Sequence, residues 1–120
     1  MVLIIGGAYQ GKLDYAKSTF SLDESDIFTC TGAEIDFSKR CICNIESFVL
    51  HHPNALDYFK NHRDDLKDHI LICRDIFCGV VPMGADRRNW RQEAGRLCQY
   101  LAGESEQVFR VFCGLEQRLK

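Results

Sequence analysis

The strongest constraint on the fold is the segment of residues 2–12, in which four apolar residues lead into a glycine-rich turn that ends on a lysine. A short, uninterrupted run of branched apolar residues is typical of a strand buried on both faces of a parallel sheet. Residues 12–20 have apolar side chains at helical spacing and predict a helix. The glycines therefore lie in a turn that connects a strand to a helix.

This turn matches the pattern G-x-x-x-x-G-K, with Gly6, Gly11 and Lys12 at the fixed positions. In that pattern, backbone N–H groups and the N-terminus of the following helix surround a phosphate, and the lysine adds a positive charge. The alternative is a glycine-rich turn that binds nothing, but the order strand, loop, helix favours a phosphate-binding loop. Its predicted binding residues are Gly6, Gly7, Ala8, Tyr9, Gln10, Gly11, Lys12 and Leu13.

Leu13 occupies the position after the lysine. A complete motif has Ser or Thr there to hold magnesium, whereas a leucine side chain has no oxygen to offer the ion. We therefore expect a loop that keeps its phosphate-binding part and has lost its metal-binding end.

Composition limits the class of protein. The chain has 120 residues, enough for one hydrophobic core, so we expect a single domain over residues 1–120. A formal charge of −2 gives no reason to expect nucleic acid or a membrane surface as partner. No stretch approaches the roughly 18 apolar residues of a membrane span, and the first apolar run lacks the basic start of a signal peptide. We therefore expect a cytoplasmic protein.

Seven cysteines are a high and odd number, and most of them lie inside apolar segments. In a reducing compartment this pattern indicates buried thiols and not disulfides. The pairs Cys41-x-Cys43 and Cys73-x4-Cys78 leave a metal site as the alternative, but neither has C-x-x-C spacing. We expect no metal at these cysteines.

The rest of the chain alternates predicted strands with predicted helices. Strands are expected at residues 27–30, 41–45, 69–73 and 108–113, and helices at residues 47–50, 54–67 and 84–102. This order predicts an α/β domain, a parallel sheet of about five strands with helices on both faces. Ligands then bind at the carboxyl ends of the strands, at the loops formed by residues 6–12, by the segment from Asn44 and by residues 74–82.

Four segments resemble motifs of one enzyme family. Residues 73–82 are similar to a strand-end motif S-N-E-V-G-x-G-I-V-P, and residues 88–99 to a helix F-R-D-x-x-G-R-x-N-Q. Residues 106–114 with the ending Leu119-Lys120 resemble its last strand, and the glycine loop resembles G-G-A-R-S-G-K-S. The family is the bifunctional adenosylcobinamide kinase/adenosylcobinamide-phosphate guanylyltransferase of cobalamin biosynthesis.

The resemblance implies a three-layer, P-loop NTPase-like fold, GTP or ATP as nucleotide, a corrinoid (cobinamide) as possible second substrate, and a homo-oligomer, which is a trimer in the family. It also shows departures. Leu13 replaces the family's serine, Asn44 replaces an acidic residue, and Arg74-Asp75 replaces an Asn-Glu pair. Residues 31–39 lack the helix whose histidine accepts the guanylyl group, so no nucleophile is assigned.

Two hypotheses about function follow. In the first, Lys12 and the loop hold a triphosphate, and Asp75 or Glu46 replaces the missing metal or hydroxyl partner in a kinase step. In the second, a nucleotide-binding or interaction protein has kept the fold and lost the chemistry. Because phosphoryl transfer depends strongly on metal-assisted charge stabilisation, we favour reduced catalysis, with magnesium contributing little.

Several further residues carry weaker signals. Four arginines in the last helix form either a solvated face or a phosphate or subunit contact, His51-His52 is expected to be a helix end, and Trp90 is expected in the core. The strand-rich tail of residues 108–120 presents two phenylalanines close to the chain end and predicts self-association. The four arginines are Arg87, Arg88, Arg91 and Arg96.

Overall fold

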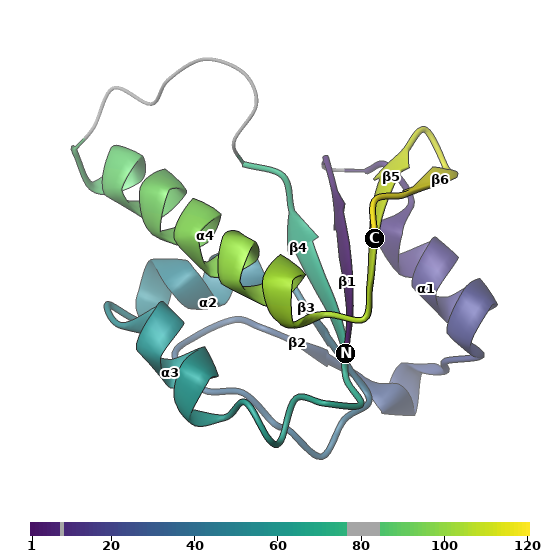
Figure 1. Ribbon diagram of the computed structural model, residues 1–120, viewed down its shortest axis with the longest axis horizontal. Coiled ribbons are helices and arrows are strands. Elements are labelled where there is room, and N and C mark those ends of the chain that lie inside the picture. Colours follow the sequence, from purple (N-terminus) through teal and green to yellow (C-terminus); the bar gives the residue numbers. More distant parts are fainter. Residues whose placement is uncertain (8, 77–84) are drawn as a thin grey trace.

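Strands and helices alternate along most of the chain. The computed structural model describes residues 1–7, 9–76 and 85–120 (Figure 1). The elements in chain order are β1 (Val2–Gly6), α1 (Lys12–Phe20), a short 3-10 helix η1 (Glu24–Asp26), β2 (Ile27–Thr29), β3 (Cys41–Cys43), α2 (Ile45–His51), α3 (Ala55–Asn61), β4 (Ile70–Arg74), α4 (Ala85–Glu104), β5 (Gln107–Phe112) and β6 (Leu115–Arg118).

The strands form one sheet in the order β2-β3-β4-β1-β5-β6. β1 lies inside the sheet, parallel to β4 on one side and to β5 on the other, with Val2 opposite both Ile70 and Gln107. Both neighbours supply ladder hydrogen bonds to the uninterrupted apolar run of β1, as expected for a buried parallel strand. The predicted α/β class and the interior position of the first strand are confirmed.

Among the described residues the sheet has six strands, where about five were predicted, and the additional strand is β6. β6 pairs with β5 in the antiparallel direction, with Phe112 opposite Leu115. The two residues between them, Cys113 and Gly114, have φ angles of 52° and 75°, which is the left-handed geometry of a tight two-residue hairpin. Because the strand itself has no apolar alternation, the sequence predicted only a tail there.

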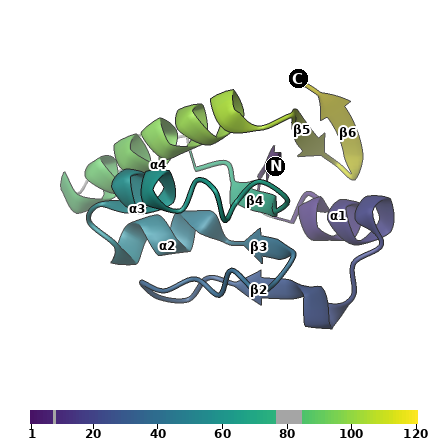
Figure 2. The same ribbon diagram turned by 60° about the horizontal axis from the view of Figure 1, so that its bottom comes forward.

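Helices cover both faces of the sheet, as predicted. Alternate residues of the strands point to opposite faces, so two separate apolar clusters form, and Figures 1 and 2 show α1 on one side and α2, α3 and α4 on the other. On the α1 face the buried cluster includes Ile4, Ala16, Ile72, Phe109 and Val111. On the opposite face it includes Leu3, Phe48, Phe59, Leu71, Leu97 and Leu101.

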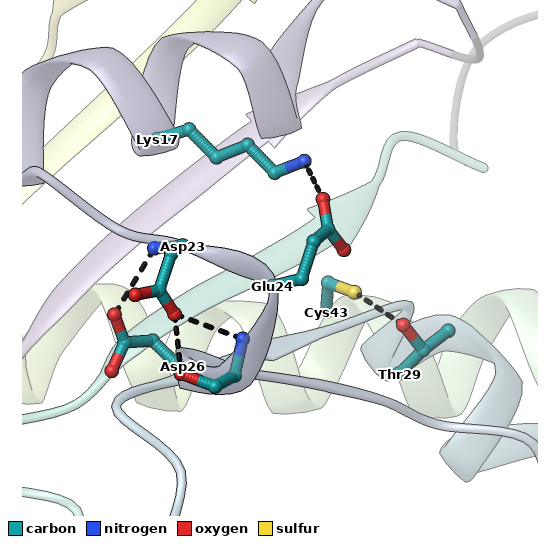
Figure 3. A network of polar contacts seen from close by, with 7 residues as sticks. Lys17, Asp23, Glu24, Asp26, Thr29 and Cys43 are labelled. Atoms are coloured by element: carbon teal, nitrogen blue, oxygen red, sulfur yellow. Dashed lines mark hydrogen bonds and ion pairs between the residues drawn. The ribbon is translucent and has the colours of Figure 1, made fainter.

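The link from α1 to β2 is held by local polar contacts (Figure 3). Asp23 caps η1, since its carboxylate accepts from the Ser25 N–H at 2.9 Å while its own N–H donates to Asp26 at 3.1 Å. Lys17 of α1 pairs with Glu24 of η1. These contacts fix the segment that leads from α1 to β2, the edge strand of the sheet.

Two element boundaries differ from the prediction. The third strand ends at Cys43 because Asn44 adopts φ 58°, ψ 43°, and α2 begins at once with Ile45. The helix predicted to reach residue 67 ends at Asn61, and turns carry the chain to Leu66, which is 1% exposed in the core. Aspartates are poor helix formers, and three of them occur at residues 64–68.

Among the described cysteines, Cys30, Cys41, Cys43, Cys73 and Cys98 are buried free thiols, and Cys113 is exposed. Burial raises the pKa of Cys30 and of Cys41 to about 12, so these thiols stay protonated. Ala8 and residues 77–84, with Cys78 and most of the predicted third loop, lie outside the described residues. Within the described part of the chain, no helix is both long and apolar enough to cross a membrane.

Candidate functional site

The carboxyl ends of β1, β3 and β4 bring three segments to one edge of the sheet. They are the glycine loop after β1, Asn44 after β3 and Arg74 at the end of β4. A cavity of about 190 Å³ lies against the loop and is lined by Tyr9, Gln10, Gly11, Lys12, Leu13, Asp14, Cys43, Asn44 and Ile72. A second, of about 500 Å³, is lined by Tyr9, Lys12, Asn44, Glu46, Ser47, Leu50, Arg74, Arg87 and Trp90.

The shape of the loop depends on its glycines. A Cβ atom at Gly6 would lie 2.5 Å from the carbonyl oxygen of Val111 in the neighbouring strand, a distance that no real side chain tolerates. Gly11, at φ 92°, begins α1 in the left-handed region, where a side chain is strained. Tyr9 also has a positive φ, 59°, and its ring is fully exposed. The loop thus brings bare backbone to the mouth of the smaller cavity.

Lys12 folds back over this loop. Its Nζ donates to the carbonyl oxygen of Gly7 at 2.6 Å. Burial lowers the pKa of Lys12 below its ordinary value, and the nearby carboxylates of Glu46 and Asp75 act in the opposite direction. A partly desolvated ammonium interacts more strongly with an anion than one in open water does. The side chain lines both cavities, where an anion can replace the Gly7 carbonyl as its partner.

Gln10 fastens the loop to the end of the chain. Its side-chain Oε1 accepts from the N–H of Cys113 at 2.6 Å, and its backbone oxygen accepts from the N–H of Gly114 at 2.9 Å. The β5–β6 turn therefore supports the glycine loop directly. The sequence placed Gln10 in the loop but gave no sign of this contact.

Glu46 is the unusual side chain of the larger cavity. It is 6% exposed, and its Oε1 accepts from the N–H of Arg74 at 3.0 Å, while Trp90 Nε1 donates to its backbone oxygen at 2.7 Å. Its second oxygen, Oε2, is buried and has no hydrogen-bond partner among the described residues. An unpaired buried carboxylate oxygen costs free energy, so this atom can accept a hydrogen bond or contact a cation from a ligand.

The other predicted site residues divide between the cavity and the surface. Asp75 is half-buried and donates its N–H to Gly6 at 2.7 Å, which joins the end of β4 to the start of the loop. Arg74 and Arg87 line the larger cavity, and the Arg87 guanidinium lies 5.6 Å from the centre of the Trp90 ring.

The other arginines of α4 lie outside this cavity lining. Arg96 pairs with Glu93 at 2.7 Å on the helix surface. Arg88 is exposed and Arg91 is half-buried. Trp90 was predicted in the core, but it is only partly buried and forms a cavity wall.

The residues suited to hold a metal are few. Leu13 and Asn44, the positions where oxygen ligands were expected, both line the smaller cavity and contribute an alkyl group and an amide. The described residues contain no group of three or more His, Cys, Asp or Glu that could hold a metal ion. His51 and His52 form a helix end, as predicted: His51 Nδ1 lies 2.9 Å from the Ser47 carbonyl oxygen, and His52 stacks on Phe48.

Comparison with protein-family models gives a match. The sequence model of a family described as cobinamide kinase / cobinamide phosphate guanyltransferase matches residues 48–119, which is more than half of the chain. The match includes α2 from Phe48 onward, β4, α4 and the β5–β6 hairpin, and it begins after the glycine loop and Asn44. No curated protein matches the chain by sequence.

Proposed function

The chain belongs to the cobinamide kinase / cobinamide phosphate guanyltransferase family, and from this premise we propose that it binds GTP or ATP at its glycine loop with reduced or lost catalysis. The observation that supports this most is the Lys12 ammonium, which is held 2.6 Å from the Gly7 carbonyl at the mouth of a cavity formed by the loop. The role in cobalamin biosynthesis follows from the family. Nucleotide binding and the loss of rate are our inference.

The phosphates would bind against the loop backbone. The N-terminus of α1 begins at Lys12 and points toward the smaller cavity, so its first N–H groups and the helix dipole favour an anion there. Gly6 and Gly11 allow close approach of the backbone, and Lys12 exchanges the Gly7 carbonyl for a phosphate oxygen. None of these contacts requires a metal, because each pairs a phosphate oxygen with a protein donor.

The larger cavity would receive the second substrate. A volume of about 500 Å³ suits a small molecule or one arm of a larger one, so a corrinoid would place only its hydroxyl-bearing arm there. Leu50 and Trp90 supply apolar contact, Arg87 a positive charge, and Glu46 Oε2 an acceptor for a hydroxyl proton.

Catalysis is where the chain departs from its family. Phosphoryl transfer needs positioned cations to neutralise developing charge, and Leu13 offers no oxygen for a magnesium ion while Asn44 offers only a neutral one. Residues 31–39 contain no histidine to carry a guanylyl group. Binding should therefore outlast chemistry, and magnesium should change nucleotide affinity little.

A second function, an active kinase without the guanylyl step, is favoured by one observation. The Oε2 of Glu46 is buried without a hydrogen-bond partner among the described residues, and in an active kinase it would accept the proton of the attacking hydroxyl, the role that a carboxylate performs in kinases. The third candidate is a subunit that binds only other proteins, and it would function without a nucleotide at the glycine loop.

Calorimetric titration of GTP and ATP, each with and without magnesium, separates these functions. We expect wild type to bind a nucleotide in both conditions, and Lys12→Ala to bind it at least about tenfold more weakly, since a charge-assisted contact is worth roughly 1.5–3 kcal/mol. Lys17→Ala is the matched control, because Lys17 lies on the same helix but pairs with Glu24. A nucleotide affinity that depends strongly on magnesium would favour the active kinase. If neither nucleotide binds under any condition, the remaining function is a subunit that binds only other proteins.

A further inference from the structure

The tip of the glycine loop is bonded to the β5–β6 turn. Gly6, at the start of the loop, is paired with both neighbouring strands, whereas residues 9–11 lie beyond these pairs, beside the turn at residues 113–114 (Figure 1). We propose that Gln10 is a positioning residue, which uses this turn to hold the loop in the shape that binds phosphate. The inference rests on the proposed function, because it needs a phosphate at the loop, and it adds a link from the β5–β6 hairpin to that site.

Gln10 accepts from both N–H groups of the turn. Its side-chain Oε1 accepts from Cys113 at 2.6 Å, and its backbone oxygen accepts from Gly114 at 2.9 Å. In a two-residue hairpin these two N–H groups lie outside the ladder between the strands and ordinarily bond to water. A single residue of the loop therefore satisfies both donors, and a displacement of the turn would displace the loop with it.

The backbone around Gln10 needs such support. Tyr9 has φ 59° and Gly11 has φ 92°, so the chain is left-handed on both sides of Gln10. For a residue other than glycine this conformation is unfavourable and persists only where the surrounding structure holds it. The Tyr9 ring is fully exposed, so packing of that ring does not hold the backbone. The hydrogen bonds of Gln10, the next residue, do.

The same contacts place the first turn of α1. Gly11 directly precedes this helix, whose first N–H groups would face the phosphate. A Cβ atom on Gly11 would lie 3.4 Å from the Cα atom of Gly114, so the backbones of the loop and the turn pack closely. Lys12 follows at once. A shift of the turn would therefore move the helix N-terminus and Lys12 together, and these are the groups that the proposed function assigns to phosphate binding.

The alternative is that the glycines alone fix the loop and that its contact with the turn does not affect binding. Gly6 and Gly11 permit a crowded or left-handed backbone, but glycine supplies conformational freedom and does not select one conformation. Two hydrogen bonds to one turn do select one. The alternative also predicts that the turn is unaffected when a phosphate binds, and this difference can be measured.

Hydrogen exchange of the wild-type chain, followed by NMR, tests the link directly. The probes are GTP and inorganic tripolyphosphate, which carries the phosphate chain without the nucleoside. Because coupling between two sites is reciprocal, a bound probe should slow exchange of the Cys113 and Gly114 N–H groups at least about fivefold. The control is the Leu119 N–H, which donates to Val108 in the same hairpin at 2.8 Å and should slow less.

Calorimetry with the same two probes tests the residue. Gln10→Ala loses the side-chain contact with Cys113 and should bind each probe about three- to tenfold more weakly, which is the effect of one hydrogen bond. A bound probe should no longer slow exchange at Cys113 in this variant. Gln117→Ala is the matched control, because it makes the same substitution in β6, opposite Arg110, and it should bind both probes as wild type does. Circular dichroism checks that both variants fold.

The outcomes distinguish this proposal from the proposed function. Equal affinities of Gln10→Ala and wild type would overturn the role of Gln10, and so would exchange in the turn that stays unchanged when a probe binds. Binding of tripolyphosphate without binding of GTP would refute the nucleotide function, and the tripolyphosphate comparison would then decide the role of Gln10. If neither probe binds to wild type, both proposals are wrong.

Discussion

Replacing Glu46 by glutamine should barely change stability while it removes a ligand contact. In this variant Oε1 can still accept from the Arg74 N–H, and an uncharged NH2 group takes the place of Oε2, the oxygen without a partner among the described residues. The NH2 group is itself buried without an acceptor among the described residues, so the relief comes only from burying a neutral group in place of a charged one, on the order of 1–3 kcal/mol. Lost attraction to Lys12, whose pKa Glu46 helps to raise, costs on the order of 1–2 kcal/mol at an effective dielectric constant of about 20.

These two terms oppose one another, so the free energy of unfolding of Glu46→Gln should lie within about 1 kcal/mol of wild type. Breaking a buried carboxylate that is fully paired costs about 3–5 kcal/mol instead. Urea unfolding monitored by circular dichroism distinguishes the two cases. A loss of 3 kcal/mol or more would show that Oε2 has a partner inside the protein and would refute the assignment of this oxygen to a ligand.

The same variant tests function. If Oε2 accepts a substrate hydroxyl, an amide NH2 at that place cannot, and affinity for a hydroxyl-bearing acceptor such as cobinamide should fall about tenfold or more. Glu93→Gln is the matched control, since Glu93 is a partly buried glutamate already paired with Arg96. Calorimetry should show unchanged acceptor binding for the control. Equal affinities of Glu46→Gln and wild type would remove Glu46 from the site.

Three further predictions concern the loop and the core. Gly6→Ala forces β1 away from the Val111 carbonyl and should lower the free energy of unfolding by about 1–3 kcal/mol; an unchanged urea midpoint would contradict the tight approach. The folded-state pKa of Lys12 lies below its ordinary value of 10.5, so the folded protein binds fewer protons at this residue than the unfolded chain does. The free energy of unfolding of wild type, relative to that of Lys12→Met, should therefore rise with pH through the window just below 10.5. Urea titrations of the two proteins at several pH values would show this rise. Cys30 and Cys41 have folded pKa values of about 12, against an ordinary value of 9.0. As the pH rises above 9.0, their thiols lose protons more readily in the unfolded chain, which favours unfolding. Between pH 8 and 10, the variant with both cysteines replaced by alanine should therefore lose less stability than wild type.

The parts of the site that the sequence predicted are those whose causes are local. The run of residues 2–5 needs no distant information to read as a buried strand, and the spacing of Gly6, Gly11 and Lys12 fixes the loop that follows. The order of strands and helices then puts Asn44 and Arg74 beside that loop, because carboxyl ends of parallel strands meet at one edge. The structure confirms this placement.

What the sequence could not supply depends on contacts between distant residues. The bonds from Cys113 and Gly114 to Gln10 join positions 103 and 104 residues apart, and no local pattern encodes them. The unpaired oxygen of Glu46 is defined only once β4 and α4 have placed Arg74 and Trp90 around it. The sequence did not reveal β6, because this polar edge strand forms by pairing with β5 after a tight turn and shows no apolar alternation of its own.

The proposed function requires nucleotide binding to persist without catalysis, and the two make different demands on this site. The shape of the glycine loop is fixed by packing that stability itself requires, since Gly6 lies against β5 and Gln10 is bonded to the β5–β6 turn. A loop maintained in this way keeps its N–H groups and Lys12 in place for a phosphate even without selection for turnover. The metal-side positions Asn44 and Leu13 both face the smaller cavity, and Leu13 also packs against the apolar cluster on the α1 face. The chain therefore retains the features that its fold needs for stability, and under the proposed function the same features would hold an anion.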